Sequence, residues 1–125
     1  MPTGVLTVHW DDKKGAELHI AVPPTLAVTT NLMQQIYSAH RYASLEAGYA
    51  ALTFQDTRII SYFSGMKGNI VGEPNYAVAM LLRKDEPIAK FKELLLAESK
   101  GILANILSPK IKDLLNALFD KMKRC

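Results

Sequence analysis

The sequence predicts an α+β fold in which a five-stranded antiparallel sheet is covered by helices. Two pairs of short segments are typical of strands, the first pair by its period-two alternation of apolar and polar residues and the second by its apolar, β-branched and aromatic composition, and a brief polar turn joins each pair. One helical segment lies between the two pairs, and the longer helical segments come at the end of the chain. Two hairpins around one helix, with the longer helices last, make a sheet covered by helices the economical arrangement.

The first hairpin is predicted from residues 5–10 and 17–22, which alternate on either side of the polar turn at residues 11–15. We expect the apolar members of the second strand to lie on one side of it. These residues are Leu18, Ile20 and Val22. Pro23 and Pro24 end this strand, because proline has no N–H to donate to a ladder.

One amphipathic helix and a second hairpin follow. Apolar residues recur at spacings of three and four over residues 26–43, which predicts a helix that ends before Gly48. Residues 49–54 and 58–63 are rich in apolar, β-branched and aromatic side chains, and only a tight polar turn at residues 55–56 separates their strands. We therefore expect the third and fourth strands here.

The most apolar segment, Tyr76–Leu82, predicts the central strand of the sheet. It is apolar on both faces, as a strand covered from above and below must be. A segment with three glycines, residues 64–74, precedes it and favours a loop. If the fifth strand pairs with the first, the strands numbered along the chain take the order 2-1-5-4-3. Residues 1–125 then form a single domain with β-β-α-β-β-β-α-α topology.

Two cap-and-proline signals predict where the terminal helices begin. In Asp85–Pro87, two acidic residues precede a proline suited to the first helical turn, and Ser108–Pro109 repeats this pattern. Gly101 interrupts the apolar stripe of the first of these helices. Residues 87–107 therefore form either one long helix that bends at the glycine or two short helices that meet there.

Composition is that of an ordinary globular domain. Hydrophobic residues make up 49% of the chain and charged residues 22%, which excludes the signature of a disordered segment. The longest apolar stretch is far below the ~20 residues that a membrane-spanning helix needs. Cys125 is the only cysteine, so the sequence allows no intramolecular disulfide and no cysteine-based metal cluster. We expect a cytoplasmic protein.

The net charge of +3 is concentrated at the C-terminal end of the chain. The basic residues there are Lys110, Lys112, Lys121, Lys123 and Arg124. A basic helix can favour an acidic membrane surface or a nucleic acid, but basic residues are also common near a helix C-terminus, where the helix dipole favours them. We expect no nucleic-acid partner and at most a peripheral membrane contact.

No combination of residues predicts catalysis, a metal or a cofactor. His9 and His19 are expected on neighbouring strands, but no cysteine or carboxylate stands at ligand spacing. Cys125 has no histidine near it in sequence to act as a base. The segment Gly65–Gly72 lacks the Gly-Lys-Ser/Thr that leads into a helix in a phosphate-binding loop. We therefore expect a protein that is not an enzyme.

The predicted order of elements resembles the longin fold of the longin and roadblock superfamily. The resemblance covers nearly the whole chain and includes the hairpin at residues 5–15, the proline pair after it, and the strand Asn75–Leu82 that leads into a proline-started helix. It implies a platform for small GTPases, a trafficking subunit or a dimerising scaffold. The roadblock branch carries a further helix before the first strand, so the longin side fits better. Profilin-like and sensor-type folds have related sheets.

The third strand is the best candidate for an interaction site. Residues 49–54 contain no charge, whereas the other predicted edge carries Glu17 and His19, and soluble proteins usually protect an exposed edge. We expect this strand to pair with the same strand of a second copy, or with a related domain, beside antiparallel packing of the helix at residues 26–43. The expected interface residues are Gln34, Gln35, Ser38, Arg41, Tyr42, Tyr49, Ala51 and Thr53.

These features favour a dimeric adaptor, scaffold or regulator that binds a partner protein. The resemblance suggests a small GTPase or a component of vesicle trafficking as that partner. Two alternatives stay open at this point. The sheet and the glycine-rich loop can enclose a small-ligand pocket of a sensor domain, and the basic last helix can recruit the chain to a membrane, with Cys125 as a candidate lipid site.

Overall fold

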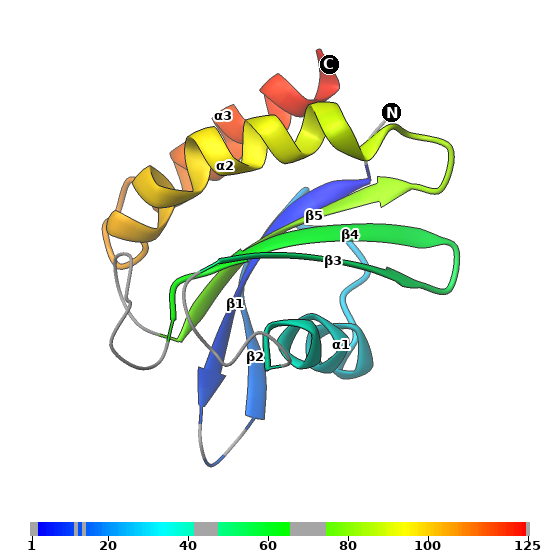
Figure 1. The fold of residues 1–125 in the computed structure, drawn as a ribbon. Coiled ribbons are helices and arrows are strands. Elements are labelled where there is room, and N and C mark those ends of the chain that lie inside the picture. Colours follow the sequence, from blue (N-terminus) through cyan, green and yellow to red (C-terminus); the bar gives the residue numbers. More distant parts are fainter. Residues whose placement is uncertain (1–2, 12, 14, 42–47, 66–74, 125) are drawn as a thin grey trace.

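The computed structural model describes residues 3–11, 13, 15–41, 48–65 and 75–124, and shows an α+β fold of three layers (Figure 1). Helix α1 lies against one face of the sheet, and α2 and α3 lie side by side on the other face. The elements are β1 Gly4–Asp11, β2 Gly15–Val22, α1 Thr30–Arg41, β3 Gly48–Phe54, β4 Thr57–Phe63, β5 Tyr76–Arg83, α2 Ile88–Ala104 and α3 Ile111–Lys123. The predicted succession of strands and helices is confirmed.

The five strands form one antiparallel sheet in the order β2-β1-β5-β4-β3, as predicted. β5 is central and pairs with β1 on one side and with β4 on the other. Val78 and Ala79 are neighbours on β5, and neither side chain is exposed although they point to opposite faces. Burial on both faces explains why this strand has no polar side chain between Ala77 and Leu82.

Each face of the sheet has its own hydrophobic core. Val78 and Met80 on β5 pack with Leu95 of α2 and Leu115 of α3, so these two helices cover the first face. On the second face, residues of β1, β4 and β5 pack with one side of α1. The fully or nearly fully buried residues of this second core include Leu6, Ile36, Ile59, Ala79 and Leu81.

The prediction for β2 was wrong in one respect, because the strand does not keep a strict alternation. Val8 lies opposite Leu18 and Thr7 lies opposite Ile20, so His19 is an extra residue in a β-bulge. The bulge moves Leu18 to the α1 face with its partner Val8, while Ile20 packs in the core beneath α2 and α3. Leu18 is therefore 43% exposed near the edge of the sheet.

Helix α1 begins later than the apolar spacing predicted. Residues 26–29 precede the helix, and Oγ1 of Thr29 accepts a hydrogen bond of 3.1 Å from the backbone N–H of Leu32. This contact satisfies one of the N–H groups that a helix leaves unpaired in its first turn. Leu26 still packs against the second core, so it contributes its apolar side chain without being helical.

Helix α2 is a single helix that continues through Gly101, which decides between the two predicted alternatives. The cap expected at Asp85–Pro87 was wrong in its details. Pro87 is the N-cap residue and no side chain caps the helix, while the Glu86 carboxylate accepts a hydrogen bond from the N–H of Arg83. Similarly, α3 begins beyond Pro109, and Oγ of Ser108 accepts the N–H of Lys110 in the turn before it.

None of the helices among the described residues is long and apolar enough to cross a membrane. α2 spans 17 residues and carries several lysines and glutamates along its length. At a rise of ~1.5 Å per residue, a helix needs about 20 apolar residues to cross the hydrocarbon core of a bilayer. α3 is shorter still, at 13 residues.

Gly4, the first residue of β1, lies very close to the end of β2 and to the segment that follows it. A Cβ atom at Gly4 would lie 2.7 Å from the backbone oxygen of Val22 and 2.9 Å from a methyl group of Leu26. By contrast, a Cβ atom at Gly101 on the exposed side of α2 would meet no atom within 4 Å. Substituting alanine at these two positions should therefore change the free energy of unfolding in opposite directions.

Replacing Gly4 by alanine should destabilise the protein by about 1–3 kcal/mol, because the backbone of Val22 must shift to admit the methyl group. The matched change Gly101→Ala should stabilise it by about 0.5–1 kcal/mol, since alanine loses less conformational entropy in a helix. Urea unfolding monitored by circular dichroism measures both changes. A Gly4→Ala variant as stable as the wild type would contradict the close approach.

Candidate functional site

β3 lies at one edge of the sheet, and within the described part of the chain only β4 pairs with it. Its sequence, Gly-Tyr-Ala-Ala-Leu-Thr-Phe, contains no charged residue. The opposite edge, β2, carries Glu17 and the bulge at His19, both of which hinder pairing with another strand. Of the two edges in the described part of the sheet, β3 is therefore better suited to pair with a further strand.

The register of the β3–β4 hairpin identifies the backbone groups that face outward. The two-residue turn at Gln55 and Asp56 connects the strands, and Gln55 has the positive φ of 56° that such tight turns need. Phe54 and Thr57 flank this turn and form a hydrogen-bonded pair, after which hydrogen-bonded and non-hydrogen-bonded pairs alternate. The residues whose N–H and C=O groups point away from β4 are Tyr49, Ala51 and Thr53.

The side chains of these three residues lie on the α2 face of the sheet, as the pairing of Ala51 with the buried Ile60 shows. Ala51 and Thr53 are exposed and small, so neither hinders the approach of another strand. The Tyr49 ring is half-buried, and Nζ of Lys92 on α2 lies 4.6 Å from its centroid. Partial burial raises the pKa of the Tyr49 hydroxyl above its ordinary value.

On the α1 face, Leu52 and Phe54 of β3 pack against the second core. A groove of about 280 Å³ opens beside the end of the strand, between the segment before α1 and the β3–β4 turn. Its apolar lining includes Leu26, Leu32 and Phe54. The apolar surface near the edge thus continues from the strand towards the start of α1.

The predicted interface residues of α1 do not share one side of the helix. Successive residues are turned by about 100° around the axis, so Gln35 lies on the flank of Leu32, the side nearest Phe54 of β3. Gln34 lies on the opposite flank, because its Nε2 would be 3.1 Å from a Cβ atom placed on Gly15. Only the exposed Gln35 is therefore brought towards the β3 edge.

Of the remaining predicted residues, Ser38 is half-buried and lies between the two flanks of α1. Arg41 is the last residue of the helix, and Tyr42 lies outside the described residues. The structure consequently brings Gln35, Tyr49, Ala51 and Thr53 to one side of the molecule. Lys92 belongs with them, although no sequence pattern predicted that a side chain of α2 reaches over β3.

The two histidines of the first hairpin share an aromatic neighbour. His9 and His19 lie on one face of the sheet with Tyr76 as a common neighbour, at ring distances of 4.6 and 5.4 Å. Burial, and to a lesser extent the nearby His9, lower the pKa of His19. Oγ1 of Thr7 lies 3.0 Å from its Nδ1. The described residues contain no group of three or more side chains placed to hold a metal ion.

His40 and Ser61 form a buried polar pair that joins α1 to β4. Nε2 of His40 lies 2.6 Å from Oγ of Ser61, and the two residues are 1% and 0% exposed. Burial lowers the pKa of His40 to about 4, so the ring is neutral at physiological pH. A serine beside a histidine is also the arrangement of an activated nucleophile, but a substrate cannot reach an oxygen this deeply buried.

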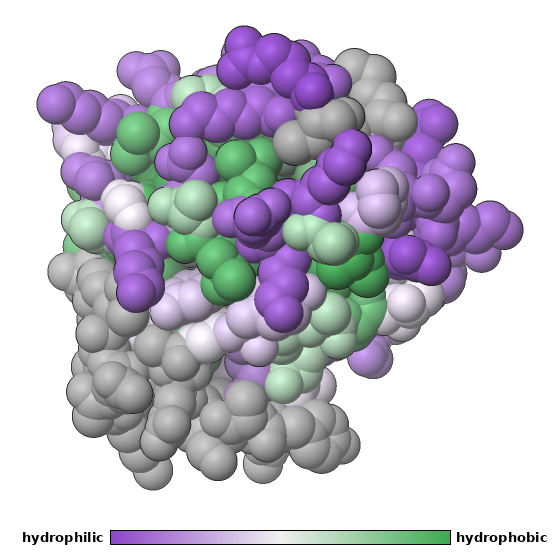
Figure 2. All heavy atoms as spheres, turned by 45° about the horizontal axis from the view of Figure 1, so that its top comes forward, coloured by the Kyte–Doolittle hydropathy of each residue, from purple (hydrophilic) through white to green (hydrophobic). Residues whose placement is uncertain are grey.

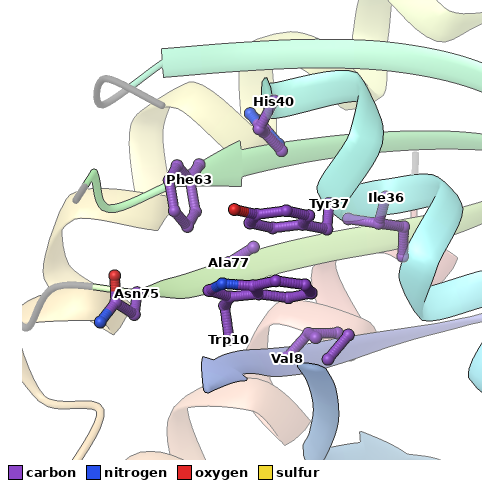
Figure 3. A pocket seen from close by; sticks show the side chains of 9 residues that line it. Val8, Trp10, Ile36, Tyr37, His40, Phe63, Asn75 and Ala77 are labelled. Carbon is purple, nitrogen blue, oxygen red and sulfur yellow. The ribbon is translucent and has the colours of Figure 1, made fainter. Parts of the chain in front are cut away.

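A small cavity adjoins this pair, between α1 and the ends of β1, β4 and β5 (Figure 3). The rings of Trp10 and Tyr37 are stacked with their centroids 3.5 Å apart and form one wall, while Phe63 and Asn75 stand on the other side. Its volume of about 10 Å³ admits a single water-sized group. Residues 66–74, the glycine-rich segment expected to close a ligand pocket, lie outside the described residues.

The buried His40 makes stability dependent on pH. Its pKa is about 4 in the native state and 6.5 in the unfolded state, so between these values the unfolded chain binds a proton that the native chain does not. Stability should therefore fall as the pH drops from 7 to 4. A difference of 2.5 pH units, 6.5 minus 4, corresponds to roughly 3 kcal/mol at most.

The variant His40→Gln should flatten this pH dependence, because glutamine does not titrate. Denaturant unfolding at a series of pH values measures the slope, which stays informative even if the variant is less stable at pH 7. His19→Gln serves as the matched control and should leave most of the slope in place, since His19 is only partly buried. An unchanged slope in His40→Gln would show that His40 titrates normally.

The chain matches no protein-family model, and no curated protein matches it. The longin-like assignment therefore stays a prediction that rests on the order of the strands and helices. That order is the one now seen in the structure.

Proposed function

We propose that this chain is a non-enzymatic adaptor or scaffold that dimerises through β3 and presents the resulting surface to a partner protein. The observation that carries the proposal is the uncharged β3 edge, whose outward N–H and C=O groups have no strand to pair with among the described residues. Natural proteins normally block such an edge with charge, proline or a bulge, as β2 does. A second copy of the chain supplies a matching strand.

The N–H and C=O groups of β3 that point away from β4 are arranged symmetrically around Ala51. In an antiparallel pair related by a two-fold axis, Ala51 lies opposite Ala51 of the second copy, and Tyr49 lies opposite Thr53 at both ends. Three hydrogen-bonded pairs of this kind provide about six hydrogen bonds, each worth roughly 0.5–1.5 kcal/mol net. The free-energy cost of association consumes part of this gain, so side-chain contacts near the strand must contribute.

Side chains that can contribute such contacts lie on both faces of the sheet beside β3. Ala51 and Thr53 are small enough for close approach on the α2 face, and Gln35 is exposed on the α1 side. The groove beside Phe54 offers additional apolar surface. A continuous sheet across the two copies, flanked by the two α1 helices, is the assembly that this arrangement supports, whether the second strand comes from an identical or a related domain.

A small GTPase or a trafficking component is the partner class that we favour, on the basis of the resemblance to longin domains. The β3 edge by itself does not select among proteins. The small-ligand sensor receives less support, because the cavity beside His40 admits only a water-sized group. The adaptor therefore remains the leading proposal.

Light scattering coupled to size-exclusion chromatography tests the dimer. At tens of micromolar the wild type should show twice the chain mass of 13.9 kDa. Ala51→Lys should weaken dimerisation at least about a hundredfold, because two lysines would then face each other across the two-fold axis. Leu18→Lys adds the same charge to the opposite edge and should leave the dimer intact. A wild type that is strictly monomeric would refute the dimer.

A pull-down with the purified chain as bait tests the partner class. Small GTPases loaded with a GTP analogue or with GDP are offered separately, and capture should depend on the bound nucleotide. Retention by the wild type and loss in Ala51→Lys would show that the partner recognises the dimer. Equal retention by the wild type and by Ala51→Lys would show that the partner binds a single copy. If no GTPase is retained, this partner class is contradicted, whereas the dimer is tested independently by light scattering.

A further inference from the structure

Helix α2 exposes a large apolar side chain, Leu96, and the turn after the helix exposes another, Leu107. Phe91, Leu95 and Ile102 face the sheet and are at most 3% exposed. An exposed flank of the helix carries a row of residues at helical spacing that continues into the turn after the helix. We call this row the outer ridge, and it consists of Lys92, Leu96, Lys100, Ala104 and Leu107. Figure 2 shows apolar atoms exposed among the hydrophilic ones on the helical side of the molecule.

Leu107 is held outward by the residues around it. The backbone turns tightly after α2, with the N–H of Ser108 donating to the carbonyl of Asn105 and the N–H of Ile111 donating to that of Ser108. Ile106 and Ile111 on either side are buried, at 1% and 6% exposure, whereas Leu107 is 64% exposed. Its exposure thus follows from an anchored turn and not from a frayed end. The anchored Leu107 and the exposed Leu96 are therefore candidate contact residues.

Basic residues surround the outer ridge. Residues 88–124 contain eight Lys and Arg against four Asp and Glu, a net charge of +4, while the whole chain has +3. Near the C-terminus, Lys121 pairs with Glu98 and Lys123 pairs with Asp120. The side chains of Lys100, Lys110 and Lys112 form no ion pair within the described ranges. The basic end predicted from the sequence therefore extends to the turn between α2 and α3, where the lysines are exposed.

We propose that the outer ridge docks the protein onto an anionic lipid bilayer. Lys92 and Lys100 flank Leu96 along α2, and Lys110 follows Leu107 after the turn, so the two leucines can enter the interface while these lysines stay at the level of the headgroups. This pattern fits a bilayer better than a nucleic acid, which would bind the lysines but leave both leucines in water.

Docking in this way is compatible with the adaptor proposal but does not depend on it. α1 lies on the face of the sheet opposite α2 and would point away from the bilayer. A single leucine pair with a few lysines gives weak and reversible attachment, and binding must weaken with salt because the headgroup attraction is screened. The chain would then bind membranes peripherally.

Sedimentation with vesicles tests this inference directly. The wild-type chain should bind vesicles of phosphatidylcholine that contain roughly a third phosphatidylserine, and should bind far less to phosphatidylcholine alone. The double variants Leu96→Ser/Leu107→Ser and Lys100→Glu/Lys110→Glu should each lower the partition coefficient at least about tenfold. Circular dichroism checks that both variants stay folded, as expected for exposed positions.

Two matched controls separate the ridge from general surface effects. Leu18→Ser removes a leucine that is 43% exposed on β2, close to the 42% of Leu96, and Lys13→Glu reverses an exposed charge in the β1–β2 turn. Both should bind vesicles like the wild type. The proposal fails if the ridge variants bind as well as these controls, or if the wild type ignores anionic vesicles. Capture of DNA or of an acidic protein in place of vesicles, lost in the same variants, would also overturn it.

Discussion

The burial of β5 on both faces is the constraint on which the arrangement of this molecule depends. Because neighbouring residues such as Val78 and Ala79 both need a hydrophobic partner, one helix is required on one face and at least one on the other. β5 therefore takes the centre, its partners β1 and β4 lie beside it, and the hairpin partners β2 and β3 are left outside. The position of β3 at the edge is thus a consequence of where the most apolar strand must lie.

The two proposed contact surfaces belong to different layers of the molecule. The β3 edge offers backbone hydrogen bonds and small side chains in the plane of the sheet, whereas the outer ridge offers leucines and lysines on the helical layer. Lys92 connects them, since its ammonium group lies over the ring of Tyr49 while its helix carries the ridge. Apart from Lys92, the two proposed surfaces share no residue, so the two proposals allow one molecule to contact a membrane and another protein at the same time.

The sequence predicted the strands and their order well, because a period of two and a fully apolar segment reflect burial directly. It could not reveal the bulge at His19, which depends on how β2 matches β1 across the ladder. The start of α1 at Thr30 follows from a cap that competes with apolar spacing. For the candidate site, β3 was identified from its lack of charge, but the separation of Gln34 from Gln35 required knowing which side of α1 faces the sheet. The contact between His40 and Ser61, which are 21 positions apart, had no signal in sequence.

The difference between the two edges of the sheet has a further consequence for self-association. A sheet with two open edges can add copies at both ends and grow without limit, as fibrils do. Here the extra residue at His19, together with Glu17, makes β2 a poor template for another strand. Pairing at β3 would therefore occupy the edge of each molecule that accepts another strand. Assembly would then stop at a closed dimer instead of extending into a filament.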